Sequence, residues 1–155
     1  MMQFTSADAR AQLAWRAPYS ARMTAMTAES SADFDRAEAS VRASLDRSDI
    51  TLVEVPAPQR LAPRAMALSG ELLSGDEELA SGRLVLLHDP SGHETWQSTF
   101  RLVTFVRAEV EPEVGADPLL PEVGWSWLLD ALASRDLDYR AASGTVTRVL
   151  SRSFG

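Results

Sequence analysis

Residues 83–111 read RLVLLHDPSGHETWQSTFRLVTFVRAEVE, and this stretch decides the fold class. Its opening residues form a nearly continuous apolar run, which is typical of a central strand covered on both faces. Further on, apolar and polar side chains alternate with the period of a strand. The segment between the two runs, 89–94, contains the turn-forming residues Pro and Gly. The stretch therefore predicts a β-hairpin with strands at 83–88 and 96–111, joined by a moderately long loop.

The alternation along 96–111 assigns its side chains to two faces of the sheet. Arg101, Val103, Phe105, Arg107 and Glu109 point one way, and the apolar residues between and around them point the other way. We expect the second face to belong to the core. We expect the face of Phe105 to be partly covered around that residue.

The segments on either side of the hairpin add strands and helices to it. A helix is predicted over 33–47, where Phe34, Ala37, Val41 and Leu45 form one apolar stripe and Ser31 or Asp33 caps the N-terminus. A second helix begins near Pro121 or Glu122 and presents Trp125, Leu128, Leu129 and Leu132. Further strands are predicted at 50–55 and 145–150, and 65–73 is a strand or a short helix. The Pro-rich segment 56–63 is expected to be a stiff surface crossing, with a ligand for an aromatic groove as the alternative.

The order of these elements, α-β-β-β-β-α-β, predicts an α+β fold. We expect a mainly antiparallel sheet of about five strands with two helices packed on it. Residues 31–155 form a single domain in this interpretation, since neither an internal repeat nor a second composition block is present. Residues 1–30 are expected to be a disordered tail or an upstream extension, and an Arg-rich targeting peptide is the alternative.

The composition excludes several kinds of chemistry. The chain contains neither Lys, Asn nor Cys, and all 15 of its basic residues are Arg. A Schiff-base nucleophile, a P-loop lysine, a thiol nucleophile and a Cys-ligated metal site are therefore excluded. The net charge of −7 argues against phosphate backbones and anionic lipid as partners. A nucleic-acid-binding regulator would need several Arg gathered on one face.

The strongest candidate for chemistry is the segment that holds the only two histidines. His88, Asp89, His93 and Glu94 could together bind a divalent metal or act in acid–base catalysis. Neighbouring side chains on a strand diverge, however, and Asp-Pro-Ser-Gly is a good turn sequence. We therefore favour a turn here and expect neither a cofactor nor a metal. A small metal-dependent or hydrolytic enzyme that uses these four residues stays open as the alternative.

The strongest candidate for binding is the segment 118–129, PLLPEVGWSWLL. Trp125 and Trp127 lie two positions apart, so on a helix they point about 200° apart and cannot both face one core. We expect one Trp to be buried with Leu128 and Leu132. The other, beside Leu119 and Leu120, would then be an anchor on a partner surface, unless 118–123 folds over it.

Three blocks of sequence together resemble a known family. They are PAPQRLAP (56–63), GRLVLLHDPSG (82–92) and DPLLPEVGWSWL (117–128), and SGTVTRV (143–149) follows them. Over about 33–155 the chain resembles the actinobacterial family called domain of unknown function 3000. The resemblance implies no activity, cofactor or catalytic residue. It implies that members continue beyond Ser-Phe-Gly, so that this chain would be truncated and the strand at 145–153 would leave an unpaired edge.

The sequence therefore predicts a cytoplasmic, non-enzymatic protein-interaction or regulatory module. Its partner is expected to be a protein, with neither a nucleic acid nor a membrane involved. The candidate partner surface consists of Leu119, Leu120, Trp125 and Trp127.

Overall fold

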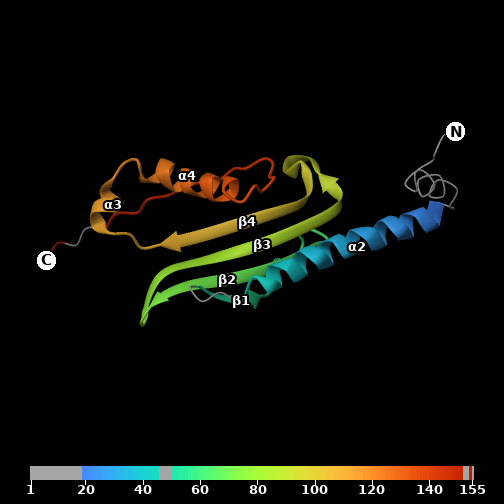
Figure 1. Cartoon of the computed structure of the whole chain (residues 1–155), viewed down its shortest axis with the longest axis horizontal. Coiled ribbons are helices and arrows are strands. Elements are labelled where there is room, and N and C mark those ends of the chain that lie inside the picture. Colours follow the sequence, from blue (N-terminus) through green and yellow to red (C-terminus); the bar gives the residue numbers. More distant parts are fainter. Residues whose placement is uncertain (1–18, 46–49, 152–153, 155) are drawn as a thin grey trace, which may run out of the picture. The chain divides into compact units, whose positions relative to one another are not determined.

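The strand β3, Glu77–His93, is an inner strand of a four-stranded antiparallel sheet (Figure 1). The order in the sheet is β1-β2-β3-β4, with β1 at Thr51–Val55, β2 at Arg64–Ser74 and β4 at Ser98–Ala108. Each strand pairs with the next one along the chain. The predicted α+β class is confirmed, and the region 65–73 is a strand. The expected number of strands, about five, is wrong, because the sheet has four.

The computed structural model describes residues 19–45, 50–151 and 154, and these residues fall into two compact units. The first unit is Met1–Asp46 and the second is Arg47–Gly155. Residues 1–18 of the expected tail lie outside the described residues, whereas 19–30 belong to a helix. None of the described helices combines the length and the apolar character that a membrane span requires.

The first unit contains the helix α2, Tyr19–Ala43. It begins well before the predicted cap at Ser31 or Asp33 and ends four residues before the predicted end. Residues 19–30 contain three Ala and two Met and neither Pro nor Gly, so the helix continues through both capping residues. The predicted stripe is confirmed as the less exposed face, since Phe34 is buried and Ala37, Val41 and Leu45 are half-buried.

Two turns of different kinds connect the strands of the second unit. Gly75, with φ of 64°, closes the turn between β2 and β3, where glycine adopts the left-handed conformation without strain. Between β3 and β4 lies the short 3₁₀ helix η1, Glu94–Trp96. The predicted hairpin is confirmed, but the loop is shorter than predicted. Residues 89–93 continue β3, and the register shifts between His88 and His93, the kind of irregular position that tolerates a proline.

The core of the sheet lies at the middle of β2 and β3. Its buried hydrophobic residues are Met66, Ala67, Leu68, Leu86 and Leu87. Because consecutive residues point to opposite faces, both faces are covered at this place, as the apolar run at 83–88 predicts. The strand β4 is not covered in the same way as β2 and β3, because the side chain of Phe105 is 67% exposed. The expectation that its face is partly covered around Phe105 is therefore wrong, and Leu102 and Val106 on the other face are exposed as well.

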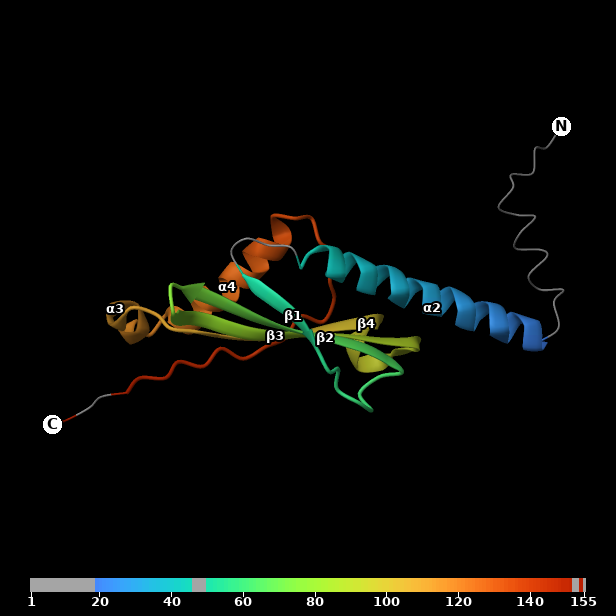
Figure 2. The same cartoon turned by 90° about the horizontal axis from the view of Figure 1, so that it is seen from below.

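Two helices and an extended segment follow β4 (Figure 2). The helix α3, Pro112–Ala116, was not expected from the acidic sequence around it. The helix α4, Leu120–Ala133, begins where Pro121 predicts. The segment 145–150 is extended but belongs to no strand, so the predicted last strand is wrong. This segment packs against α3 and α4 instead of pairing with the sheet.

Candidate functional site

The two histidines have different aromatic neighbours. His88, which is 2% exposed, lies against the ring of Phe100, with 4.3 Å between the ring centroids. His93 is exposed and stacks on Trp96 at 4.7 Å, with nearly parallel rings. The two imidazoles therefore lie in different surroundings, one in the core and one at the surface. In the described part of the chain, moreover, no three His, Asp or Glu side chains are grouped so that they could hold a metal ion.

Asp89 makes a local turn between these histidines. Its Oδ1 accepts hydrogen bonds from the backbone N–H of Ser91 at 3.0 Å and from the Ser91 hydroxyl at 2.6 Å. The two hydrogen bonds from Ser91 lower the pKa of the Asp89 carboxyl, and the nearby histidines lower it further. A carboxylate held in this way forms a local Asx turn. The turn that the sequence favours at 89–92 is otherwise part of the strand β3.

The inner face of α4 is covered by the C-terminal segment, which runs back along the helix (Figures 1 and 2). A Cβ built on Gly144 would lie 2.7 Å from Cζ3 of Trp125, and one built on Gly124 would lie 3.7 Å from Val146. Glycine at position 144 allows the segment to approach the Trp125 ring closely, whereas the distance at Gly124 is that of an ordinary contact. Trp125 is accordingly half-buried.

Arg148 fixes the far end of the same segment. Its Nη1 donates to the backbone carbonyl oxygens of Ala116 and Asp117, which close the short helix α3. A Cβ built on Gly115 would lie 3.6 Å from Leu150. The segment thus packs on α3 and α4 at three glycines, Gly115, Gly124 and Gly144, is bonded to α3 through one guanidinium, and runs outside the sheet.

The outer face of α4 carries an exposed apolar stripe. Leu119, Val123 and Trp127 recur every four residues and are 61%, 37% and 62% exposed. The residue at the N-cap, Leu119, belongs to the same stripe because its backbone is helical and its carbonyl accepts the N–H of Val123. We call Leu119, Val123 and Trp127 the α4 stripe. Exposed large apolar residues in a row mark interaction surfaces.

Only two of the four residues of the predicted partner surface are exposed. Leu119 and Trp127 are exposed, whereas Leu120 and Trp125 are half-buried on the inner side. The two Trp side chains diverge, as the helical geometry requires. Leu128 is 44% exposed, so the expectation that it is buried with one Trp is wrong. Val123, which sequence reasoning did not include, completes the stripe at the spacing of one helical turn.

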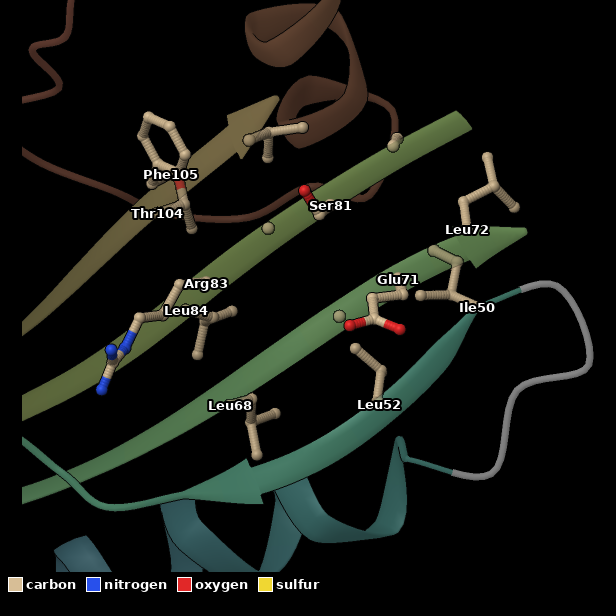
Figure 3. A pocket seen from close by; sticks show the side chains of 14 residues that line it. Ile50, Leu52, Leu68, Glu71, Leu72, Ser81, Arg83, Leu84, Thr104 and Phe105 are labelled. Carbon is tan, nitrogen blue, oxygen red and sulfur yellow. The ribbon is translucent and has the colours of Figure 1, made fainter. Parts of the chain in front are cut away.

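A second feature, an apolar hollow of about 250 Å³, lies on the sheet (Figure 3). One row of paired residues crosses it from β1 to β4, namely Leu52, Gly70, Gly82 and Val106. The two glycines leave bare backbone as a floor, and the adjacent row, Leu68, Leu84 and Thr104, forms a wall. We call this feature the glycine hollow. Sequence reasoning missed it, because a regular hairpin with its turn at Gly75 and Asp76 would pair Gly70 with Ser81, and only the register shift at Leu72 and Leu73 brings Gly70 opposite Gly82.

Comparison with known proteins gives the family of the chain. Neither the curated proteins nor the solved structures searched contain a match. A family model described as "Protein of unknown function (DUF3000)" matches residues 30–155, which is most of the chain and agrees with the resemblance in its three sequence blocks. The chain therefore belongs to the DUF3000 family of proteins of unknown function.

Proposed function

We propose that the protein is a non-enzymatic, cytoplasmic interaction module that binds another protein through the α4 stripe. The observation that supports this proposal is the exposure of Trp127, at 62%, in line with Leu119 and Val123. A large aromatic side chain on a rigid helix loses little conformational entropy on binding and is the commonest kind of binding hot spot.

The charge around the stripe indicates the kind of partner. The helix α4 carries two acidic residues, Glu122 and Asp130, and no basic residue. A partner would therefore present an apolar recess for Trp127 with basic or neutral residues at its rim. This mode corresponds to a helix that lays an apolar stripe into a groove.

Replacement of Trp127 by alanine tests the proposal. The tagged protein and its W127A variant are compared for the proteins that they retain from a lysate of the native organism. We expect W127A to weaken retention by about 30-fold or more, because a hot-spot Trp contributes that much. The thermal midpoint should not change, since Trp127 is mainly solvent-exposed.

Leu61→Ala is the matched control. Leu61 is 60% exposed and lies in the Pro-rich segment, away from α4. The L61A variant therefore measures how retention changes when an exposed apolar side chain outside the α4 stripe is lost. The proposal is wrong if W127A folds and retains the same proteins as the wild type, or if L61A loses them equally.

A further inference from the structure

We infer that the outer edge of β4 binds an extended, acidic segment of another protein as an additional strand of the sheet. This site lies on a different element from the α4 stripe, so it goes beyond the proposed function and the two can fail independently. Three observations support it: the free edge of β4, the exposed apolar residues on both faces of that strand, and two arginines on one face.

The strand β4 lies at one margin of the sheet (Figure 1). Among the described residues, β3 is the only strand that pairs with it, so one side of its backbone has no ladder. Within that part of the chain, neither α3 nor α4 makes more than a marginal contact with β4, and no backbone hydrogen bond joins the segment 141–151 to it. Such a row of backbone N–H and C=O groups is a template for another strand.

The two faces of the sheet are uncovered along β4. Val103 and Phe105 are exposed on one face, and Leu102 and Val106 are exposed on the other. Natural edge strands are often very short, or contain a proline or a bulge that prevents pairing. In contrast, β4 has 11 residues and no proline, and its pairing with β3 is regular over 100–108. A strand added here would therefore bury apolar side chains on both faces while it completes the backbone hydrogen bonds.

The face of Val103 and Phe105 also carries two arginines. Because side chains alternate along a strand, Arg101, Val103, Phe105 and Arg107 lie in one row, with a guanidinium at each end. Within the described residues, neither guanidinium forms an ion pair, and β4 contains no acidic residue. An added strand therefore meets a cation, two apolar side chains and a second cation, each opposite one of its own residues.

The complementary segment has acidic, apolar, apolar and acidic side chains at alternate positions. Its acidic residues lie opposite Arg101 and Arg107, and its apolar residues lie opposite Val103 and Phe105. Glu109 follows on the same face just after β4, so the charge changes sign there. A third acidic residue opposite Glu109 would be repelled, which fixes the position of the segment along β4.

Two other occupants fit this face less well. A second copy of β4 supplies no carboxylate and would add two further arginines to the same face. Sheets that bind single-stranded RNA commonly stack two or three bases on aromatic side chains. Of the Phe, Tyr and Trp residues in the four described strands, Phe105 alone lies on this face. The charge and the lining together therefore favour an acidic peptide.

A synthetic nine-residue peptide tests the inference. It has glutamate at its second and eighth positions, valine at its fourth and sixth, threonine elsewhere, blocked ends and a fluorescent label. Its binding to the chain is measured by fluorescence anisotropy at low ionic strength, where exposed charges are screened least. A peptide with lysine in place of both glutamates is the control for charge. We expect the glutamate peptide to bind and the lysine peptide to bind at least about 10-fold more weakly.

Glutamine in place of the two arginines tests their contribution. Arg101→Gln and Arg107→Gln should each weaken binding of the glutamate peptide by about 3-fold, and the double variant by about 10-fold, because exposed ion pairs contribute little individually. Arg60→Gln is the matched control. Arg60 is an exposed arginine in the connection between β1 and β2, away from β4, so R60Q should bind as the wild type does.

Backbone methylation distinguishes an added strand from a contact of side chains alone. The N–H groups of alternate residues in a strand point to the same edge. One version of the glutamate peptide carries N-methyl groups at its third and fifth positions, and another carries them at its fourth and sixth. We expect one version to bind about 10-fold or more weakly, because it loses two hydrogen bonds to β4, and the other to bind as the unmodified peptide does.

Each outcome supports or overturns the inference. Binding that is weakened by one methylated version and by the double arginine variant supports it. No binding of the glutamate peptide, or an equal effect of both methylated versions, overturns it. A dimer of the chain that the peptide dissociates would mean that a second copy occupies β4. Tighter binding of a thymidine oligonucleotide that Phe105→Ala abolishes would mean that the face binds nucleic acid, and either result also overturns it.

Discussion

The ring of Trp125 lies directly against the backbone of Gly144, so closely that a Cβ on this glycine would come within 2.7 Å of Cζ3. The contact joins the middle of α4 to the start of the C-terminal segment. Trp125 therefore faces the chain itself, whereas Trp127, two positions on and about 200° away around the helix, is exposed.

Gly144→Ala should detach the C-terminal segment from α4. The added methyl group overlaps a rigid ring that cannot bend aside, and overpacking of this kind costs about 1–3 kcal/mol. We expect a lower free energy of unfolding in urea and faster amide hydrogen exchange over 145–150. Gly92→Ala is a useful comparison, because a Cβ there meets nothing within 4 Å, although its φ of 76° adds backbone strain. Unchanged exchange at 145–150 in G144A would contradict the packing described.

Arg148→Met should loosen the other end of the segment. Methionine keeps much of the aliphatic stem but removes the two hydrogen bonds to the carbonyls of Ala116 and Asp117. Both bonds are solvent-exposed, so the loss of global stability should be small, about 1 kcal/mol or less. The effect should appear as faster hydrogen exchange over 146–151, with α4 unchanged. If exchange there stays as slow as in the wild type, Arg148 does not hold the segment.

Asp89 should titrate below the ordinary range of an aspartate. Its pKa is lowered because Ser91 donates two hydrogen bonds to the charged carboxylate. Since the folded-state pKa lies below the unfolded value, this turn adds stability above the unfolded pKa and loses it as the pH falls through the folded one. Carbon-13 NMR of the Asp89 carboxyl measures the folded value directly.

The hydroxyl of Ser91 is the main cause of this shift, so its removal gives a matched pair of variants. Ser91→Ala should move the pKa of Asp89 upward, toward its ordinary value. Ser91→Thr, which keeps a hydroxyl, should leave it low. A pKa that is the same in all three proteins would show that the hydrogen bond to this hydroxyl is not what stabilises the carboxylate.

Local patterns in the sequence predicted those features that depend on neighbouring residues. The apolar run at 83–88 identified a strand covered on both faces, and the four-residue spacing around Phe34 identified the less exposed face of α2. The start of α4 followed from Pro121, which suits the first turn of a helix. The divergence of Trp125 and Trp127 followed from helical geometry alone.

Features that depend on distant contacts were missed or predicted wrongly. Segment 145–150 has the composition of a strand, but it packs on α4, where Gly144 allows a close approach to Trp125. Strand propensity alone does not predict which of these two partners the segment takes. The glycine hollow exists because Gly70 and Gly82 become neighbours across a hairpin, 12 positions apart in sequence. Phe105 is exposed because no element in the described part of the chain covers that side chain of β4. The alternation of side chains along a strand does not predict whether another element covers a face.

The two glycines of the hollow should differ sharply in their tolerance of alanine. A Cβ on Gly82 would lie 2.9 Å from the backbone carbonyl oxygen of Phe105, whereas a Cβ on Gly70 would lie 2.9 Å from Cδ2 of Leu52. A backbone oxygen held in the β3–β4 ladder cannot move without disturbing the pairing, but a leucine methyl group can rotate away. We expect G82A to reduce the free energy of unfolding by about 1–3 kcal/mol, and G70A by less than about 1 kcal/mol.

Urea unfolding of both variants measures this difference, and Gly70→Ala serves as the matched control because it adds the same methyl group to the same row of the sheet. The strand propensity of alanine is the same in both places, so only the neighbouring atom differs. Equal losses would mean that β3 and β4 can separate locally as easily as Leu52 can change its rotamer. A larger loss in G70A would mean that the surrounding side chains hold Leu52 in its rotamer more firmly than the β3–β4 pairing holds the carbonyl of Phe105.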